Sequence, residues 1–190
     1  MWMCYMYTQI EEAVYFMMKA YKGQKRKNDN IDKSFHSMAV YMTMKDITNI
    51  EDVLIASILH NIIDDTEFGY EEIEEKFGTL VADMVSDLSE DMSIAKWFTR
   101  KKDFIKRMKS VNDVNVINIM IADKLQDLLS GYKMFKKVGD KIWKSTSGTK
   151  TEQCFIYRES YNIAKSKNAN QNLLDRYKKL LKIYFGDFDE

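Results

Sequence analysis

The chain has 190 residues, and its 29 basic and 29 acidic side chains give a formal net charge of zero. A chain of this length is most simply one domain, which can bury roughly 70% of the surface that the unfolded form exposes. The balanced charge argues against a general nucleic-acid-binding protein, because such proteins usually carry a basic excess. We therefore expect no nucleic-acid partner.

Composition and periodicity predict helices along the whole chain. There is no proline and there are only seven glycines, while Glu, Lys, Met, Leu and Ile, which are common here, favour helix. Apolar residues recur at the i, i+3, i+4, i+7 spacing of amphipathic helices. In chain order, the expected helices cover residues 8–22, 34–45, 51–63, 69–77, 80–88, 95–109, 114–136, 150–165 and 168–184.

Two of these segments differ from the others. The segment 114–136 is apolar almost all round, which is typical of a helix at the centre of a fold, and the segment 95–109 is basic. Gly139 and the run from Ser145 to Gly148 predict a loop between helices. No repeat, low-complexity tract or linker divides the chain, so the sequence predicts an all-α single domain.

The cysteines and the first residues bear on the compartment. Cys4 and Cys154 are too few for a disulfide scaffold and lack metal-ligand spacing, so we expect reduced thiols in a cytoplasmic protein. The apolar segment 1–7 is followed closely by Glu11 and Glu12 and no basic residue precedes it. We therefore expect neither a signal peptide nor a membrane span, and no membrane partner.

The two histidines and one aspartate form a candidate metal site. His36 and His60 can each supply an imidazole nitrogen, and Asp123 lies in the most apolar expected helix, where a buried carboxylate needs a partner or a metal. Neighbouring helices commonly assemble such sites in a bundle core. Mixed nitrogen and oxygen ligands suit manganese, iron or another octahedral divalent ion better than structural zinc. The alternative is that both histidines are ordinary hydrogen-bonded side chains.

An acidic pair follows His60 and could handle water beside such a metal. On a continuous helix His60 and Asp64 share one face, and Asn61 and Asp65 share another about 100° further round. One helix edge would then present a metal ligand and, one turn later, a carboxylate that accepts a proton. The alternative is that the acidic pair is a solvated helix end.

A basic cluster lies at the end of the first expected helix. Lys22, Lys25, Arg26 and Lys27 suit a highly anionic nucleotide, and the arginine can both stack on a base and form paired hydrogen bonds. The alternative is a solvated helix end whose positive charge complements the helix dipole.

These residues belong to motifs that occur in a fixed order. The motifs are Ala20-Tyr21-Lys22-Gly23-Gln24-Lys25-Arg26-Lys27, His36, Leu59-His60-Asn61-Ile62-Ile63-Asp64-Asp65-Thr66, Tyr70-Glu71-Glu72-Ile73 through Phe77-Gly78 and Val81, Ala122-Asp123-Lys124-Leu125 and, more weakly, Gly139 to Trp143 with Tyr157-Arg158. Over residues 13–163 the chain resembles the HD-type hydrolase domain of the RelA/SpoT alarmone enzymes, in particular the free-standing small alarmone hydrolases.

This resemblance implies one HD-type phosphohydrolase domain over residues 1–190, with a core of about 8–165 and a C-terminal helix of about 168–184. It implies a manganese-dependent enzyme that removes the 3′-pyrophosphate of guanosine tetra- or pentaphosphate, a purine nucleotide alarmone. By position, the implied metal ligands are His36, His60, Asn61 and Asp123; the implied water-handling residues are Asp64 and Asp65; and the implied nucleotide-binding residues are Lys25, Arg26, Lys27 and Asp127.

The chain departs from the family pattern at the site itself. Asn61 replaces the signature aspartate, which removes one negative charge and should weaken metal binding. Asp64 is one methylene shorter than the usual glutamate, and a misplacement near 1 Å can cost about 100-fold in rate. Asp127 stands where an asparagine near the nucleotide is usual, and Leu129 where an arginine is common. A carboxylate at position 127 would repel phosphate and change the base or sugar contacts.

Several explanations of these departures stay open at this point. The protein could be an active hydrolase with a shifted substrate, such as an adenosine alarmone or NADPH, a catalytically inactive nucleotide-binding protein, or a variant engineered at position 61. The 13 Met, 11 Tyr and 10 Phe residues leave a purely structural or protein-interaction bundle as a further interpretation. The aromatic residues Trp2, Tyr5 and Tyr7 could support a homodimer, although the sequence does not fix the oligomeric state.

Overall fold

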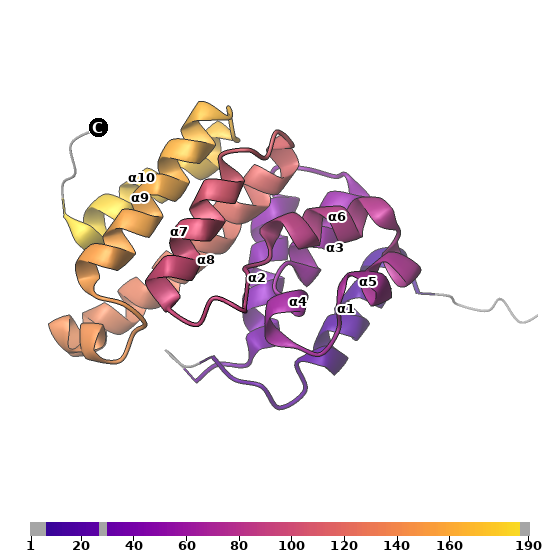
Figure 1. Ribbon diagram of the computed structural model, residues 1–190, viewed down its shortest axis with the longest axis horizontal. Helices are drawn as coiled ribbons and strands as arrows, with labels where there is room; N and C mark the ends of the chain where they lie inside the picture. The colour runs from indigo at the N-terminus through magenta and orange to yellow at the C-terminus, as the bar shows by residue number, and fades with distance from the viewer. Residues whose placement is uncertain (1–6, 27–29, 187–190) are drawn as a thin grey trace, which may run out of the picture.

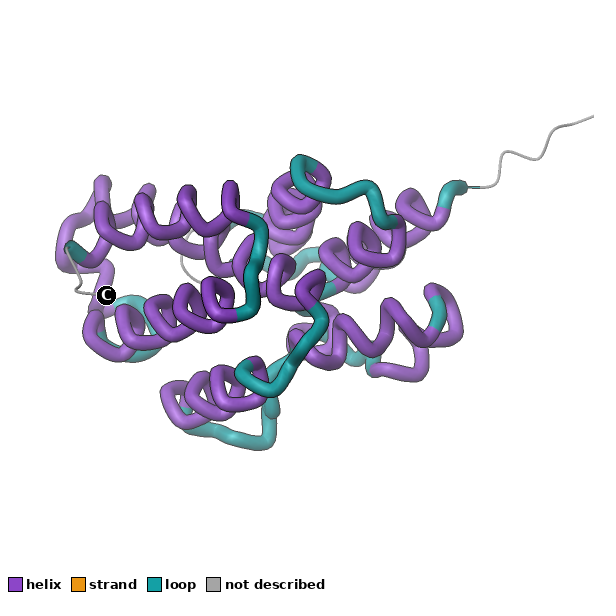
Figure 2. Tube along the Cα trace, turned by 90° about the horizontal axis from the view of Figure 1, so that it is seen from above, coloured by secondary structure: helices purple, strands orange, loops and turns teal. Residues whose placement is uncertain are grey.

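A computed structural model describes residues 7–26 and 30–186 of the chain (Figure 1). Its elements in chain order are α1 (Gln9–Ala20), α2 (Lys33–Lys45), α3 (Glu51–Leu59), α4 (Ile62–Asp65), α5 (Tyr70–Phe77), α6 (Thr79–Leu88), α7 (Trp97–Met108), α8 (Val114–Val138), the 3₁₀ helix η1 (Gly139–Lys144), α9 (Lys150–Ser166) and α10 (Gln171–Phe185). Figure 2 shows these helices joined by loops, without strands in the described part. The predicted all-α fold is confirmed.

Two helices form the centre of the fold. Helix α3 packs against α1, α2, α6 and α8, and all of its residues from Val53 to Leu59 are buried. Helix α8 packs against α2, α3, α6, α9, α10 and η1, as expected for the most apolar segment. Because α2, α3 and α8 also contact one another, their side chains can converge at one point in the interior.

The last helices form the second half of the molecule, seen at the left of Figure 1. Helix α10 packs on α8 and α9, and α7 packs on α9. The expected loop after α8 instead begins as η1, because Ile142 is buried and Trp143 stacks on Tyr184 with ring centroids 5.3 Å apart. The apolar side chains therefore give this segment a fixed conformation.

The third expected helix is shorter than the sequence predicts. Helix α3 ends at Leu59, His60 and Asn61 form a turn, and α4 begins at Ile62. His60 Nδ1 donates to the carbonyl oxygen of Ser57 at 2.8 Å, and so competes for the acceptor that the next helical N–H would use. The prediction of one continuous helix over 51–63 was wrong, and His60 and Asp64 are not successive positions on one helix face.

None of the helices in the described chain combines the length and the hydropathy that a membrane crossing requires. Of the aromatic residues proposed for a dimer contact, Trp2 and Tyr5 lie outside the described residues. Tyr7 is 61% exposed and stacks on Tyr15 at 6.4 Å between ring centroids.

Gly148 allows a close approach that connects the segment before α9 to α7. Its φ of +74° lies in the left-handed region, and a Cβ atom would lie 2.2 Å from the Trp97 ring. Gly139 has a φ of +60° but no atom within 4 Å of a Cβ position. The two glycines therefore share a backbone constraint, and only Gly148 adds a steric one.

We expect Gly148→Ala to destabilise the protein more than Gly139→Ala. Each substitution costs about 1 kcal/mol in backbone strain, and Gly148→Ala should cost about 1–3 kcal/mol more because the indole must move. Urea unfolding of the two variants measures the difference. Equal free energies of unfolding would contradict the close approach.

Candidate metal centre and active-site cleft

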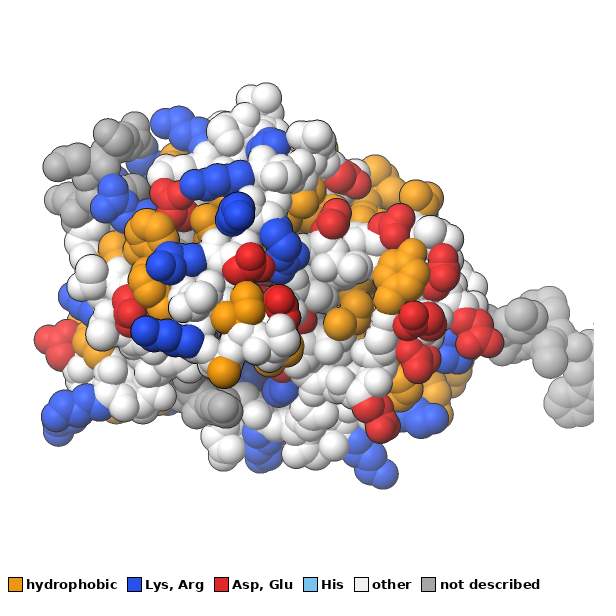
Figure 3. Space-filling model, viewed as in Figure 1, with side chains coloured by type: hydrophobic (Ala, Val, Ile, Leu, Met, Phe, Trp, Pro, Cys, Tyr) orange, Lys and Arg blue, Asp and Glu red, His pale blue; other side chains and the backbone are white. Residues whose placement is uncertain are grey.

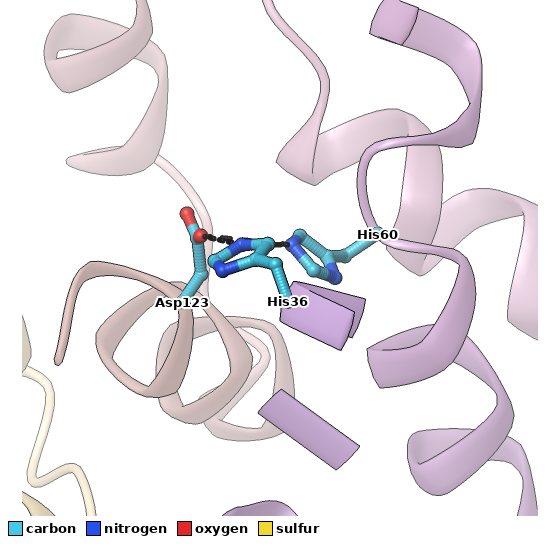
Figure 4. A group of neighbouring side chains, drawn as sticks. All are labelled: His36, His60 and Asp123. Atoms are coloured by element: carbon cyan, nitrogen blue, oxygen red, sulfur yellow. Dashed lines mark hydrogen bonds and ion pairs between the residues drawn. The ribbon is translucent and has the colours of Figure 1, made fainter. Parts of the chain in front are cut away.

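Three side chains from three helices meet in the interior. His36 from α2, His60 from the end of α3 and Asp123 from α8 point toward one another (Figure 4). His36 Nε2 lies 2.9 Å from Asp123 Oδ1 and 3.3 Å from His60 Nε2, and His60 Nε2 lies 3.6 Å from the same Asp123 oxygen. All three residues are buried. The predicted histidine and aspartate residues are thus brought together.

The hydrogen bond to Ser57 orients the His60 ring. Because His60 Nδ1 donates to that carbonyl oxygen, a neutral ring carries its lone pair on Nε2, the atom that faces His36 and Asp123. A backbone carbonyl in this position is the usual way in which a protein fixes the ring of a metal-binding histidine. The local fold therefore prepares His60 Nε2 as a ligand.

The three ligand atoms fit a divalent ion. Adjacent ligands about 2.1 Å from one ion lie about 3.0–3.4 Å apart, which is close to the separations seen here. In the described part of the chain, His36 Nδ1 is buried without a hydrogen-bond partner. Without an ion, His36 Nε2 can donate to the Asp123 carboxylate, and with an ion bound the Nε2 atoms of both histidines would face it. The separations of the three ligand atoms are therefore compatible with a divalent ion.

Asp123 is held as a carboxylate by its surroundings. Burial alone would raise its pKa, but the Lys124 ammonium and the hydrogen bonds from the two histidines outweigh burial and hold the pKa of Asp123 well below its usual range. Lys124 Nζ lies 2.6 Å from Asp123 Oδ2, and Asp123 with the two neighbouring acidic residues Asp127 and Glu90 keeps the pKa of Lys124 raised despite burial. Asp123 therefore presents one oxygen to the histidines and the other to a cation.

Asn61 lies beside the three ligands. It precedes α4 as the N-cap residue and lines two hollows, one with Asp123 and the other with His36. Its role as a neutral metal ligand stays a prediction.

Asp64 has the electrostatic character of a general base. Its two carboxylate oxygens accept the backbone N–H of Glu90 at 3.0 and 3.1 Å. Burial, together with the negative charges of Glu90 and Asp65, raises its pKa to about 6, although the hydrogen bond and Lys101 oppose that shift. A carboxylate with a pKa near neutrality can both accept and release a proton.

Asp65 occupies a different position from its neighbour. It forms an ion pair with Lys33 of α2 at 2.8 Å and lines the same hollow as Asn61 and His36. Its charge is therefore already compensated by a neighbouring helix, which distinguishes it from Asp64.

The predicted nucleotide-binding residues are separated by the structure. Arg26 Nη2 lies 2.6 Å from Asp127 Oδ1, and both line the hollows next to the metal ligands. Lys25 is exposed on the loop before α2 and is not among the lining residues, while Lys27 lies outside the described residues. Asp127 thus faces an arginine, which offsets the repulsion of phosphate expected from its charge.

Four further residues contribute to the cleft. The sequence predicted no site role for Glu90, Trp97 or Lys101, and Lys124 appeared only within a motif. Glu90 forms ion pairs with Arg100 and Lys101, and two of the three hollows are lined by both Trp97 and Lys101. The basic character of segment 95–109 was the one signal for Lys101, and the sequence does not show which face of α7 meets the metal ligands.

The lining residues connect three hollows into one cleft. Asp127 lines all three, and Asn61 and Asp65 are shared by the two nearest the metal ligands. The hollow beside Asp64 has a volume of about 220 Å³. In Figure 3 basic side chains gather over the half of the surface that contains α7, whereas acidic ones dominate over α5 and α6. The cleft therefore contains carboxylates near the metal ligands and basic side chains around them.

Residues 13–146 match the family model of the HD domain, which is more than half of the chain. The chain belongs to the HD domain family. Within the matched range, His60 is followed by Asn61 and not by an aspartate.

Curated relatives include alarmone enzymes. A guanosine-3′,5′-bis(diphosphate) 3′-pyrophosphohydrolase of Aquifex aeolicus is 26% identical over 73% of this HD protein and 20% of its own length. The enzyme of the same description from Drosophila melanogaster, MESH1, is 32% identical over 41% of this chain and 42% of its own length. The resemblance to the RelA/SpoT-type enzymes is confirmed, although the chain spans only about a fifth of the Aquifex relative.

Two solved structures share the fold. The first, a metazoan SpoT ortholog described as hydrolysing ppGpp, superimposes with a TM-score of 0.76 at 20% identity, covering 96% of this chain and 99% of the other. The second, lmo0812 of Listeria monocytogenes, gives a TM-score of 0.71 at 25% identity, covering 80% and 99%. Both solved chains therefore share the helical arrangement of this protein over nearly their whole length.

We expect the protein to bind one Mn²⁺ ion per chain. His60→Gln should weaken that binding by at least about 100-fold, because one of the side chains that bind the ion directly is lost. Asn61→Asp should tighten binding, since it adds a negative charge beside the ion. Titration calorimetry with metal-free protein measures both effects. Asp83→Asn, at an exposed position that bonds Tyr70, is the matched control. Unchanged affinity in His60→Gln would exclude this site.

We also expect Asp64→Asn to stabilise the metal-free protein at pH 7.5 by about 1–3 kcal/mol. The pKa of Asp64 is about 6 in the fold against 3.8 ordinarily, so the folded form binds more protons between these values and its charge costs stability above pH 6. That cost disappears as the pH falls toward 4, so the gain should be much smaller there. Urea unfolding in chelator at both pH values tests this; an equal gain at both would contradict it.

Proposed function

We propose that this HD protein is a metal-dependent nucleotide pyrophosphohydrolase that removes the 3′-pyrophosphate of guanosine tetra- or pentaphosphate. The observation that carries the proposal is the buried trio of His36, His60 and Asp123, which lies beside a carboxylate of raised pKa in a cleft lined by cations. The names of the relatives supply the substrate class. A purine nucleotide as partner and a cytoplasmic location belong to the same proposal.

The metal would be held by His36, His60 and Asp123, with Asn61 as a weaker fourth ligand. We favour Mn²⁺ because two imidazoles, a carboxylate and an amide oxygen form a mixed nitrogen and oxygen set. When bound, such an ion acidifies water and neutralises phosphoryl oxygens. The neutral amide at position 61 leaves this set with one negative charge less than the family pattern.

Asp64 would take the proton of the attacking water. Its carboxylate is oriented by the Glu90 N–H, and its raised pKa makes it a stronger base than an exposed aspartate. Asp65 is paired with Lys33, so we assign it the role of orienting the attacking water. This division of roles follows from the different partners of the two carboxylates.

The cations of the cleft would bind the phosphate oxygens and the nucleotide. Lys124 and Lys101 line the hollow that contains Asp64, and Lys101 also lines the hollow that contains Arg26. Their charges would stabilise the pyrophosphate as its bond to the ribose 3′ oxygen breaks. The 3′ oxygen takes up a proton and becomes a hydroxyl group. Arg26, fixed by Asp127, would lie toward the base.

The deciding experiment measures pyrophosphate release from guanosine tetraphosphate by the manganese-loaded protein. We expect turnover by the chain as it stands, a higher rate at limiting Mn²⁺ for Asn61→Asp, and none for Asp123→Asn. Turnover only in Asn61→Asp would identify a nucleotide-binding protein disabled at one ligand. Absence of release by both, also from pentaphosphate, would reject the proposal, and adenosine alarmones and NADPH would then be the substrates to examine.

A further inference from the structure

Glu90 lines the hollow that contains Asp64, and no sequence motif marks it. It belongs to the segment between α6 and α7, and its side chain is 12% exposed. Its backbone N–H donates to both oxygens of Asp64 at 3.0 and 3.1 Å. Its own carboxylate accepts Arg100 Nε at 2.9 Å through one oxygen and Lys101 Nζ through the other.

The side chain of Glu90 therefore fixes the backbone that holds Asp64. Arg100 also donates to the carbonyl oxygen of Ile94 at 2.8 Å, and Arg107 donates to that of Ser89 at 2.6 Å. These contacts attach both ends of the segment to α7. Asp64 lies in α4, a helix of four residues, so its carboxylate needs such external support.

We propose that Glu90 is a positioning residue for Asp64, transmitting the rigidity of α7 to the water-handling carboxylate through its two ion pairs and its backbone N–H. The inference rests on the proposed function, because it assigns Asp64 the proton transfer. Glu90 does not itself take the proton; it orients Asp64 through its backbone N–H, and its negative charge adds to the raised pKa of Asp64. The ion pairs serve as the anchor and the N–H as the contact.

A double-mutant cycle separates positioning from a general structural role. We expect Glu90→Ala to lower kcat by about 10- to 100-fold, with a smaller change in KM, because the Asp64 carboxylate loses its fixed orientation. Glu90→Gln keeps an acceptor for Arg100 and should retain more activity. In an Asp64→Asn background neither change should lower the residual kcat further, since residues that act as one unit are not additive.

One control variant and two contrary outcomes accompany the double-mutant cycle. Asp83→Asn, which alters the exposed hydrogen bond with Tyr70, should leave kcat unchanged. Equal losses from Glu90→Ala with Asp64 intact and in the Asp64→Asn background would overturn the inference. A change confined to KM would also overturn it, because Glu90 would then act only on the charge of Lys101 and Arg100.

The amide resonance of residue 90 gives a readout without turnover. In ¹⁵N spectra of metal-free protein, Asp64→Asn should shift this amide, because the carboxylate is its acceptor. The same substitution should shift it far less in a Glu90→Ala background, where the segment has lost the two ion pairs that fix the residue 90 backbone. An undiminished shift would overturn the inference even if the enzyme hydrolysed no nucleotide, so this arm stays decisive when the proposed function fails.

Discussion

Asp123 is 6% exposed, and a carboxylate so deeply buried is costly unless charges and hydrogen bonds surround it. Here the two histidines approach one oxygen and Lys124 the other. These partners come from α2, the end of α3 and α8 itself, so the same packing that closes the core also creates the metal site. The stability of this region and its chemistry consequently depend on one group. A cation bound between the two histidine nitrogens and Asp123 would both compensate the buried charge and provide the reactive ion.

The charges of the cleft are balanced internally. Arg26 faces Asp127, Lys33 faces Asp65, and Lys101 with Arg100 faces Glu90. Each pair is partly buried, so its members are screened less by solvent than surface charges are. A divalent cation would offset part of the negative charge of a polyanionic ligand, so the two together would add less net charge to the cleft than the ligand alone. This balance agrees with the zero net charge of the whole chain.

The fold followed from the sequence more completely than the site did. Helical periodicity located the main helices within a few residues, and the apolar character of segment 114–136 identified the central helix, because both signals are local. The end of α3 was missed because it depends on a bond from the His60 side chain to the backbone. Glu90 was missed because its contacts with Asp64 and α7 join residues that the sequence separates by a helix or a loop.

The residues of the cleft are distributed unevenly among the helices. Asp123, Lys124 and Asp127 lie within two turns of α8, and Gly131, one turn further, lines the same cleft as Asp127. Each residue of an α-helix turns the chain by about 100° and advances it by about 1.5 Å. One inserted or deleted residue between positions 123 and 131 would therefore swing the later residues onto another side of the helix. The spacing of residues along α8 therefore fixes which of its side chains reach the cleft.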